Sequence, residues 1–227
     1  FNVNGIDKER IKDDPRFPYG IPRNDNGNYI WIQLFLSALK DSGRAGFVMA
    51  NSASDAGHSE KDIRTKMIDD GLVDVMVAVG PNMFYNVTLP VTLWFLDKGK
   101  KKTDRKDRIL FVDARNIYHQ IDRAHRDWTE EQIQQITDIV RSYRGEKDTK
   151  KYKDVKGLCR VATLDEIRTA GYSLNPGRYV GIADNGSVSN ADFETTVRGL
   201  NTEFQKLTDE AHDLEKKIVD NFKKLGI

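Results

Sequence analysis

Residues 73–96 have the sequence VDVMVAVGPNMFYNVTLPVTLWFL, and this stretch decides the predicted fold. Its two continuous apolar runs, 73–79 and 91–96, are typical of strands that are covered on both faces of a sheet. The link at 80–90 is too short for a crossover helix, because parallel neighbours need about a dozen or more connecting residues. The stretch therefore predicts an antiparallel hairpin at one side of an otherwise parallel sheet.

The flanking segments predict an α/β fold around this hairpin. Short apolar runs predict further strands at 44–50 and 109–112, and helical spacing of apolar residues predicts helices at 28–40, 59–71 and 129–143. We expect Ser59 and Thr129 to cap the last two helices. Strand, helix and strand in this order indicate a doubly wound sheet.

Outside this core the pattern changes at both ends. Residues 1–27 are rich in turn residues and predict a long loop, and residues 155–182 predict short irregular elements. We place a domain boundary near residue 150, which gives regions 1–150 and 151–227.

A heptad pattern then predicts one long helix at 191–225. Its apolar positions are Phe193, Val197, Leu200, Phe204, Leu207, Ala211, Leu214 and Ile218. Such a helix needs a neighbour along its length, either a second copy, its own domain or a partner.

Composition excludes several classes of function. The 36 basic residues almost balance the 35 acidic ones, so any basic face must be local. No apolar run approaches the ~18 residues that span a membrane. Cys159 is the single cysteine, which excludes an intrachain disulfide and makes a reducing, cytosolic compartment the default. His119, His125 and the two other histidines lack metal-ligand spacing, and no zincin, P-loop or nucleophile-elbow motif is present.

The charged turn at 97–108 is interpreted as a solvated loop in preference to a phosphate-binding patch.

The aromatic loop is the informative chemical feature. Phe84 and Tyr85 lie between the two central strands, in a link that would normally be polar. They could fold back and cap the core. Alternatively, they could hold a planar ligand, because ligands of open α/β sheets bind outside the carboxyl ends of the strands. An enzyme that modifies a nucleic-acid base takes the base out of the stack and holds it between flat side chains.

Several ordered motifs resemble one family. They are residues 27–100, which begin GNYIWIQLFLSAL and end LPVTLWFLDKGK, residues 108–136, RILFVDARNIYHQIDRAHRDWTEEQIQQI, then GYSLNPGRYVG at 171–181 and the terminal heptad helix. Together they resemble the C-terminal portion of the modification (M) subunit of type I restriction–modification systems. The resemblance implies a C-terminal half of a Rossmann-like methyltransferase sheet, mostly parallel with one antiparallel hairpin strand, in region 1–150. It implies an assembly extension in region 151–227.

The resemblance also implies an activity, which is adenine-N6 methylation of double-stranded DNA with S-adenosylmethionine as methyl donor. Phe1 resembles the aromatic residue of the family's Asn-Pro-Pro-Phe motif, which stacks on the flipped adenine. Phe84, ahead of Tyr85, resembles the second wall of that base pocket. The donor-binding motifs correspond to sequence upstream of Phe1, so we assign no donor-binding residue here and expect this chain to be inactive alone. We also expect its sheet to lack strands unless another chain supplies them.

The resemblance further implies partners. The helix at 191–225 would dock on the specificity (S) subunit, in a cytoplasmic complex with a second M subunit and with restriction (R) subunits. One alternative is a truncated assembly module that retains only this docking helix. The other is an unrelated α/β ligand-binding domain with an aromatic loop.

Overall fold

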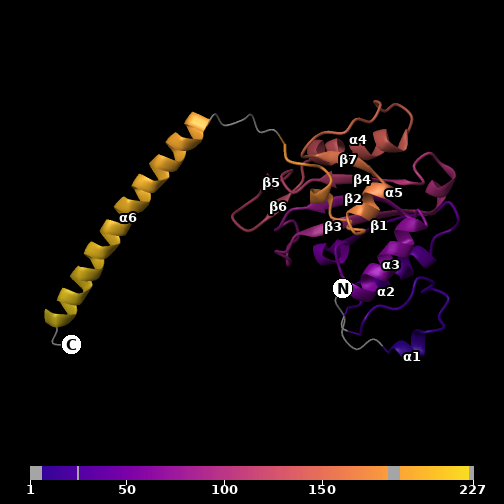
Figure 1. Ribbon diagram of the computed structural model, residues 1–227, viewed down its shortest axis with the longest axis horizontal. Coiled ribbons are helices and arrows are strands. Elements are labelled where there is room, and N and C mark those ends of the chain that lie inside the picture. Colours follow the sequence, from indigo (N-terminus) through magenta and orange to yellow (C-terminus); the bar gives the residue numbers. More distant parts are fainter. Residues whose placement is uncertain (1–6, 25, 184–189, 225–227) are drawn as a thin grey trace. The chain divides into compact units, whose positions relative to one another are not determined.

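A five-stranded mixed sheet organises the first of two units, Phe1–Ala183, in the computed structural model (Figure 1). The structure describes residues 7–24, 26–183 and 190–224. In order across the sheet the strands are β1 (Arg44–Ala50), β3 (Val91–Asp97), β2 (Val73–Val79), β4 (Arg108–Asp113) and β7 (Cys159–Thr163). Strands β1, β2 and β4 run in one direction, because β3 is antiparallel to β1 and β2 while β2 and β4 are parallel.

The predicted β2–β3 hairpin is confirmed, but its position differs from the expectation. It does not lie at one side of the sheet, since β3 is inserted between β1 and β2 and pairs with both. Trp94 and Leu96 of β3 are fully buried, as a central strand requires. Strand β7 is a second departure, because residues 155–182 were expected to be irregular. It pairs antiparallel with β4, from Cys159 opposite Val112 to Thr163 opposite Arg108.

Helices cover both faces of the sheet. On one face, α2 (Asn28–Ser37), α3 (His58–Asp69) and α5 (Leu164–Thr169) pack on a core that includes Met76 and Trp94. On the other face, α4 (Glu130–Arg144) packs on the valines of β2 and on Leu110 (Figure 1). The remaining elements are α1 (Lys8–Ile11), β5 (His119–Gln120), β6 (Arg126–Asp127), and the 3-10 turns η1 (Asn51–Ser54), η2 (Lys98–Lys102) and η3 (Pro176–Arg178).

The two predicted helix caps had different outcomes. Thr129 caps α4 through a reciprocal pair of hydrogen bonds with Gln132, and Gly145 ends the helix in the left-handed conformation. The Ser59 prediction was wrong, because α3 already begins at His58 and its N-cap residue is Gly57. The Ser59 hydroxyl instead hydrogen-bonds to Glu60, at 3.2 Å.

The charged turn at 97–108 is only partly solvated, which corrects the prediction of a solvated loop. Lys100 and Arg105 are buried in it. The Lys100 ammonium group hydrogen-bonds to the carbonyl oxygens of Val73 and Arg108, at the start of β2 and β4. Arg105 forms ion pairs with two buried carboxylates, Asp74 and Asp97. These side chains are buried because their partners lie on strands that only the folded sheet brings near.

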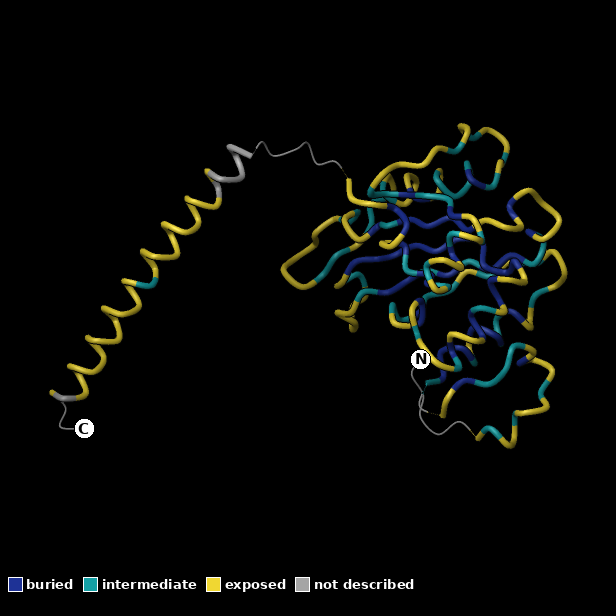
Figure 2. The backbone as a smooth tube through the Cα atoms, in the orientation of Figure 1, coloured by how far each residue is buried: buried dark blue, intermediate teal, exposed yellow. Residues whose placement is uncertain are grey.

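The first compact unit extends to Ala183, well beyond the boundary expected near residue 150, because β7 completes the sheet. The second unit, Asp184–Ile227, contains helix α6 (Asn190–Lys224), which confirms the predicted long helix. Leu200, Phe204 and Leu207 are among its exposed apolar residues. Figure 2 draws most of this helix in the colour of exposed residues. No helix within the described ranges combines the length and apolar character that crossing a membrane requires.

Candidate functional site

The aromatic loop at 80–90 leaves the carboxyl end of β2 and is held tightly there. A Cβ atom at Gly80 would lie 2.7 Å from the carbonyl oxygen of Arg115, so only glycine fits without a backbone shift. Asn82 adopts the left-handed conformation, with φ of 65°. A bridge then joins Phe84 to Val87, whose amide donates to the Phe84 carbonyl at 3.2 Å. This compact turn orients the two rings.

Phe84 does not cap the core, because its side chain is 40% exposed. It lines a cavity of about 480 Å³ between the carboxyl end of β1 and the beginning of β3. The cavity is lined by Val48, Met49, Ala50, Asn51, Ser52, Phe84, Val87, Leu89, Pro90 and Val91. Its volume and its mainly apolar walls suit a small planar ligand. Among its polar groups, the Asn51 carboxamide oxygen accepts a hydrogen bond from Thr92 at 3.0 Å.

Tyr85 lies in a different environment from Phe84, although the two residues are adjacent. It is 86% exposed, and its ring stacks on His125 with centroids 5.4 Å apart and planes inclined by 17°. A second cavity of about 470 Å³ is bounded by Asn82, Phe84, Tyr85, Ile121, Asp122, His125 and Arg126. Phe84 therefore lines both cavities, whereas Tyr85 lines only the second.

The β5–β6 hairpin forms the far wall of the second cavity. The Arg126 amide donates to the Asn82 carbonyl at 2.9 Å, which ties the hairpin to the aromatic loop. The Arg126 guanidinium lies 3.9 Å from the centroid of the Tyr118 ring. His125 Nδ1 lies 2.8 Å from Asp122 Oδ2. The pKa of Asp122 lies below its ordinary value, first because His125 hydrogen-bonds to its carboxylate and then because backbone amides do so.

Sequence reasoning found the loop rings but missed the hairpin. His125 gave no metal or catalytic spacing, and only the fold brings it against Tyr85. Phe1, the other predicted base-stacking residue, lies outside the described residues.

The methyl donor implied by the resemblance does not match the Phe84 cavity. S-adenosylmethionine has an amino-acid end with two charges, and the ten residues lining the cavity include no charged side chain. The lining suits a neutral planar base better. We therefore assign no residue of the described ranges to the donor.

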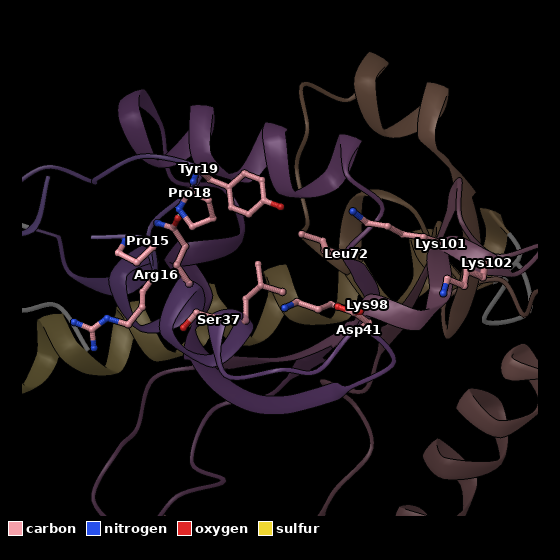
Figure 3. A pocket seen from close by; sticks show the side chains of 12 residues that line it. Pro15, Arg16, Pro18, Tyr19, Ser37, Asp41, Leu72, Lys98, Lys101 and Lys102 are labelled. Atoms are coloured by element: carbon pink, nitrogen blue, oxygen red, sulfur yellow. The ribbon is translucent and has the colours of Figure 1, made fainter. Parts of the chain in front are cut away.

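A basic cavity lies at the opposite end of the sheet. It has a volume of about 520 Å³ and is lined by Tyr19, Lys98, Lys101, Lys102 and neighbouring residues. In Figure 3 the Lys101 ammonium group and the Tyr19 hydroxyl point toward one another across it. Both interact with Asp70, the hydroxyl at 2.6 Å and the ammonium group at 4.0 Å. The length of β2, about 20 Å, separates this cavity from the aromatic loop, so it takes no part in the candidate site.

Comparisons with known proteins identify relatives along the whole chain. The family model for "N-6 DNA Methylase" matches residues 1–187. The methylase subunit of the type I restriction enzyme MjaIX from Methanocaldococcus jannaschii is 42% identical over the full chain, which covers 41% of that protein. The HindI methylase subunit from Haemophilus influenzae is 34% identical, again over the full chain, which covers 50% of that protein. The chain thus spans half or less of the length of these two curated relatives.

Solved structures show the same fold. The methyltransferase subunit of a type I restriction–modification system from Streptococcus thermophilus matches with a TM-score of 0.70 and 22% identity, over 80% of this chain and 36% of that one. The M protein of the type I restriction enzyme EcoKI matches with a TM-score of 0.54 and 18% identity, over 86% of this chain and 45% of that one.

Proposed function

Because this chain belongs to the N-6 DNA methylase family, we propose that it forms the C-terminal part of the M subunit of a type I restriction–modification enzyme. The substrate is double-stranded DNA, and the reaction is methylation of adenine N6. The observation that supports this most directly is the partly exposed Phe84 ring in an apolar cavity at the carboxyl edge of the sheet. A flipped base requires such a flat, water-excluding wall.

In this proposal the target adenine leaves the duplex and stacks on Phe84. The aliphatic walls from Val48, Leu89 and Val91 exclude water from the ring. Phe1 stacks on the opposite face, as the family resemblance implies. S-adenosylmethionine supplies an electrophilic methyl group, and the residues that hold it belong to the part of the subunit upstream of this chain. Each base–ring contact contributes about 1–3 kcal/mol.

The pocket is tested with an intact M subunit that carries this sequence as its C-terminal part, assembled with its S subunit. The target site is first read from the methylated adenines of host DNA. Phe84→Ala should lower methylation at saturating DNA by about 5- to 150-fold, which corresponds to the loss of one stacking contact. Flipping is followed independently by permanganate oxidation of the thymine opposite the target, which should also decrease.

Phe84→Tyr is the matched control, because it keeps a ring of the same size. It should retain most of the methylation rate. If Phe84→Ala leaves both methylation and thymine oxidation unchanged, the assignment of this cavity to the base is wrong.

We further propose that α6 docks the M subunit on the S subunit, in a complex that includes a second M subunit and, for cleavage, R subunits. The support is the exposed apolar face of this helix, which includes Leu200, Phe204, Leu207, Leu214 and Ile218. Leu207→Asp should prevent copurification of the S subunit. Asp209→Ser is the control. Asp209 follows Leu207 by two positions, and residues two positions apart in an α-helix point about 200° apart around the axis.

The alternative function, a module that only assembles, rests on the same helix. It predicts that the chain binds the S subunit through residues 191–227 and that no complex containing it methylates DNA. Methylation by the reconstituted complex, lost on Phe84→Ala, would exclude this alternative.

A further inference from the structure

The cavity on the Tyr85 side of the aromatic loop is not needed for the flipped base. It is distinct from the apolar Phe84 cavity, and its walls include the polar side chains of Asn82, Asp122, His125 and Arg126. A base that stacks on Phe84 within the β1–β3 cavity does not meet Tyr85, which is absent from the residues that line that cavity. Tyr85 therefore has a different task from its neighbour.

The Tyr85 ring is supported by a stacking contact but remains exposed to solvent. One of its faces stacks on His125, yet the side chain remains 86% exposed. The hairpin behind it is also ordered, because Asp122 accepts hydrogen bonds from the amides of Ala124 and His125, at 2.7 and 2.9 Å. The Arg126 amide fixes the hairpin to the loop. A ring that is already stacked on one face loses less conformational entropy on binding a flat ligand than an unsupported ring does.

The charges and apolar groups around this ring suit a nucleotide. Arg123 is exposed in the turn between β5 and β6, and Arg126 lies in the cavity wall, where it also contacts Gln120. The one carboxylate in this wall, Asp122, is already hydrogen-bonded to His125, so the two arginines supply the charge that a phosphate would meet. Ile121, 57% exposed, adds an apolar contact for a base or a sugar. Aromatic stacking combined with nearby arginine is the usual way to hold a nucleotide without reading its sequence.

We propose that Tyr85, His125 and the β5–β6 hairpin bind a DNA nucleotide that flanks the target adenine, outside the pocket of the flipped base. The inference rests on the proposed function, because it places this nucleotide beside the base on Phe84. It gives the two adjacent rings separate roles. Phe84 holds the reacting base, and Tyr85 holds the DNA beside it.

The test uses the M–S complex described above and a duplex containing its target site. Tyr85→Ala and His125→Ala should each raise the Kd for DNA by about 5- to 150-fold. Methylation at saturating DNA and permanganate oxidation of the thymine opposite the target should stay within about twofold. Tyr85→Phe and His125→Phe keep the stacked pair and should restore affinity. Arg123→Ala should reduce the slope of log Kd against log salt concentration by about one phosphate contact.

Two results would overturn the inference. The first is an unchanged Kd in Tyr85→Ala. The second is a Tyr85→Ala variant that loses both methylation at saturating DNA and thymine oxidation. These are the losses expected for Phe84→Ala, so Tyr85 would then be a wall of the base pocket. The proposed function fails separately, when Phe84→Ala has no effect. If Tyr85→Ala raises the Kd while Phe84→Ala changes neither methylation nor thymine oxidation, the DNA contact of Tyr85 is supported and the base pocket at Phe84 is not.

Discussion

Replacement of Asp74 by alanine should be among the most destabilising changes in the first unit. Asp74 lies in β2 with no exposed surface, and its carboxylate pairs with two arginines. Arg144 approaches from α4, at 2.9 Å, and Arg105 approaches from the turn before β4. Their side chains are only 13% and 7% exposed. Asp74 thus joins a strand, a helix and a turn through buried charges.

The magnitude follows from the charges that remain. In Asp74→Ala, Arg105 keeps Asp97 at 3.4 Å, but Arg144 loses the buried carboxylate with which it pairs. Removing one partner of a buried ion pair costs about 3–5 kcal/mol, because the other charge stays desolvated. The free energy of unfolding of a domain is about 5–15 kcal/mol, so this loss is a large fraction of it. For a unit of this size the loss lowers Tm by about 6–20 °C.

The measurement is urea and thermal unfolding of the full chain, followed by tryptophan fluorescence, since Trp94 is fully buried in the sheet. Asp69→Ala is the matched control. Asp69 pairs with Arg168 at 3.0 Å, but both side chains are partly exposed, at 37% and 46%. Such a pair contributes at most about 1 kcal/mol. If Asp74→Ala costs no more than Asp69→Ala, the buried ion pairs do not stabilise this fold as argued.

Two further predictions concern Lys100 and Gly80. Burial lowers the pKa of Lys100 from 10.5 to about 8. Between pH 8 and pH 10.5, Lys100 binds its proton more fully in the unfolded state than in the folded state. The free energy of unfolding should therefore increase as the pH rises from 8 to 10.5. Urea unfolding across this range should show the gain, and Lys100→Met should remove it; an unchanged slope in the variant would contradict the assignment. Gly80→Ala should cost about 1–3 kcal/mol, because its Cβ would lie 2.7 Å from the Arg115 carbonyl oxygen. It should also weaken DNA binding by displacing the aromatic loop. Gly57→Ala, with open space around the added carbon, should cost at most about 1 kcal/mol. Equal effects at the two glycines would contradict the steric argument.

Local sequence predicted much of the first unit because each signal acts over a few residues. The short link at 80–90 excludes a crossover helix, so the β2–β3 hairpin followed from chain length alone. The side chains of Thr129 and Gln132, three residues apart, each accept a hydrogen bond from the other's backbone amide. The sequence therefore also predicted where α4 begins. Phe84 was singled out as a large ring in a link, and the fold places it in a cavity wall. Its contact with adenine stays a prediction.

Other features depended on partners far along the chain. The five residues of β7 have no strong strand pattern, and their pairing with β4 exists only because the 45 intervening residues, 114–158, return to that edge. Lys100 and Arg105 lie in a turn whose composition indicates solvent exposure. They are buried because Val73, Asp74 and Asp97 converge on them.

The sequence by itself determined most of the helices and strands, their apolar faces and the family to which the chain belongs. These depend on periodicity, caps and ordered motifs, which short segments already contain. Only the tertiary structure decided that β3 lies between β1 and β2, and that Tyr85 stacks on His125 while Phe84 faces another cavity. Apolar burial is non-directional, so an apolar run specifies that it will be covered without specifying its neighbour. The neighbour follows from the packing of the whole sheet.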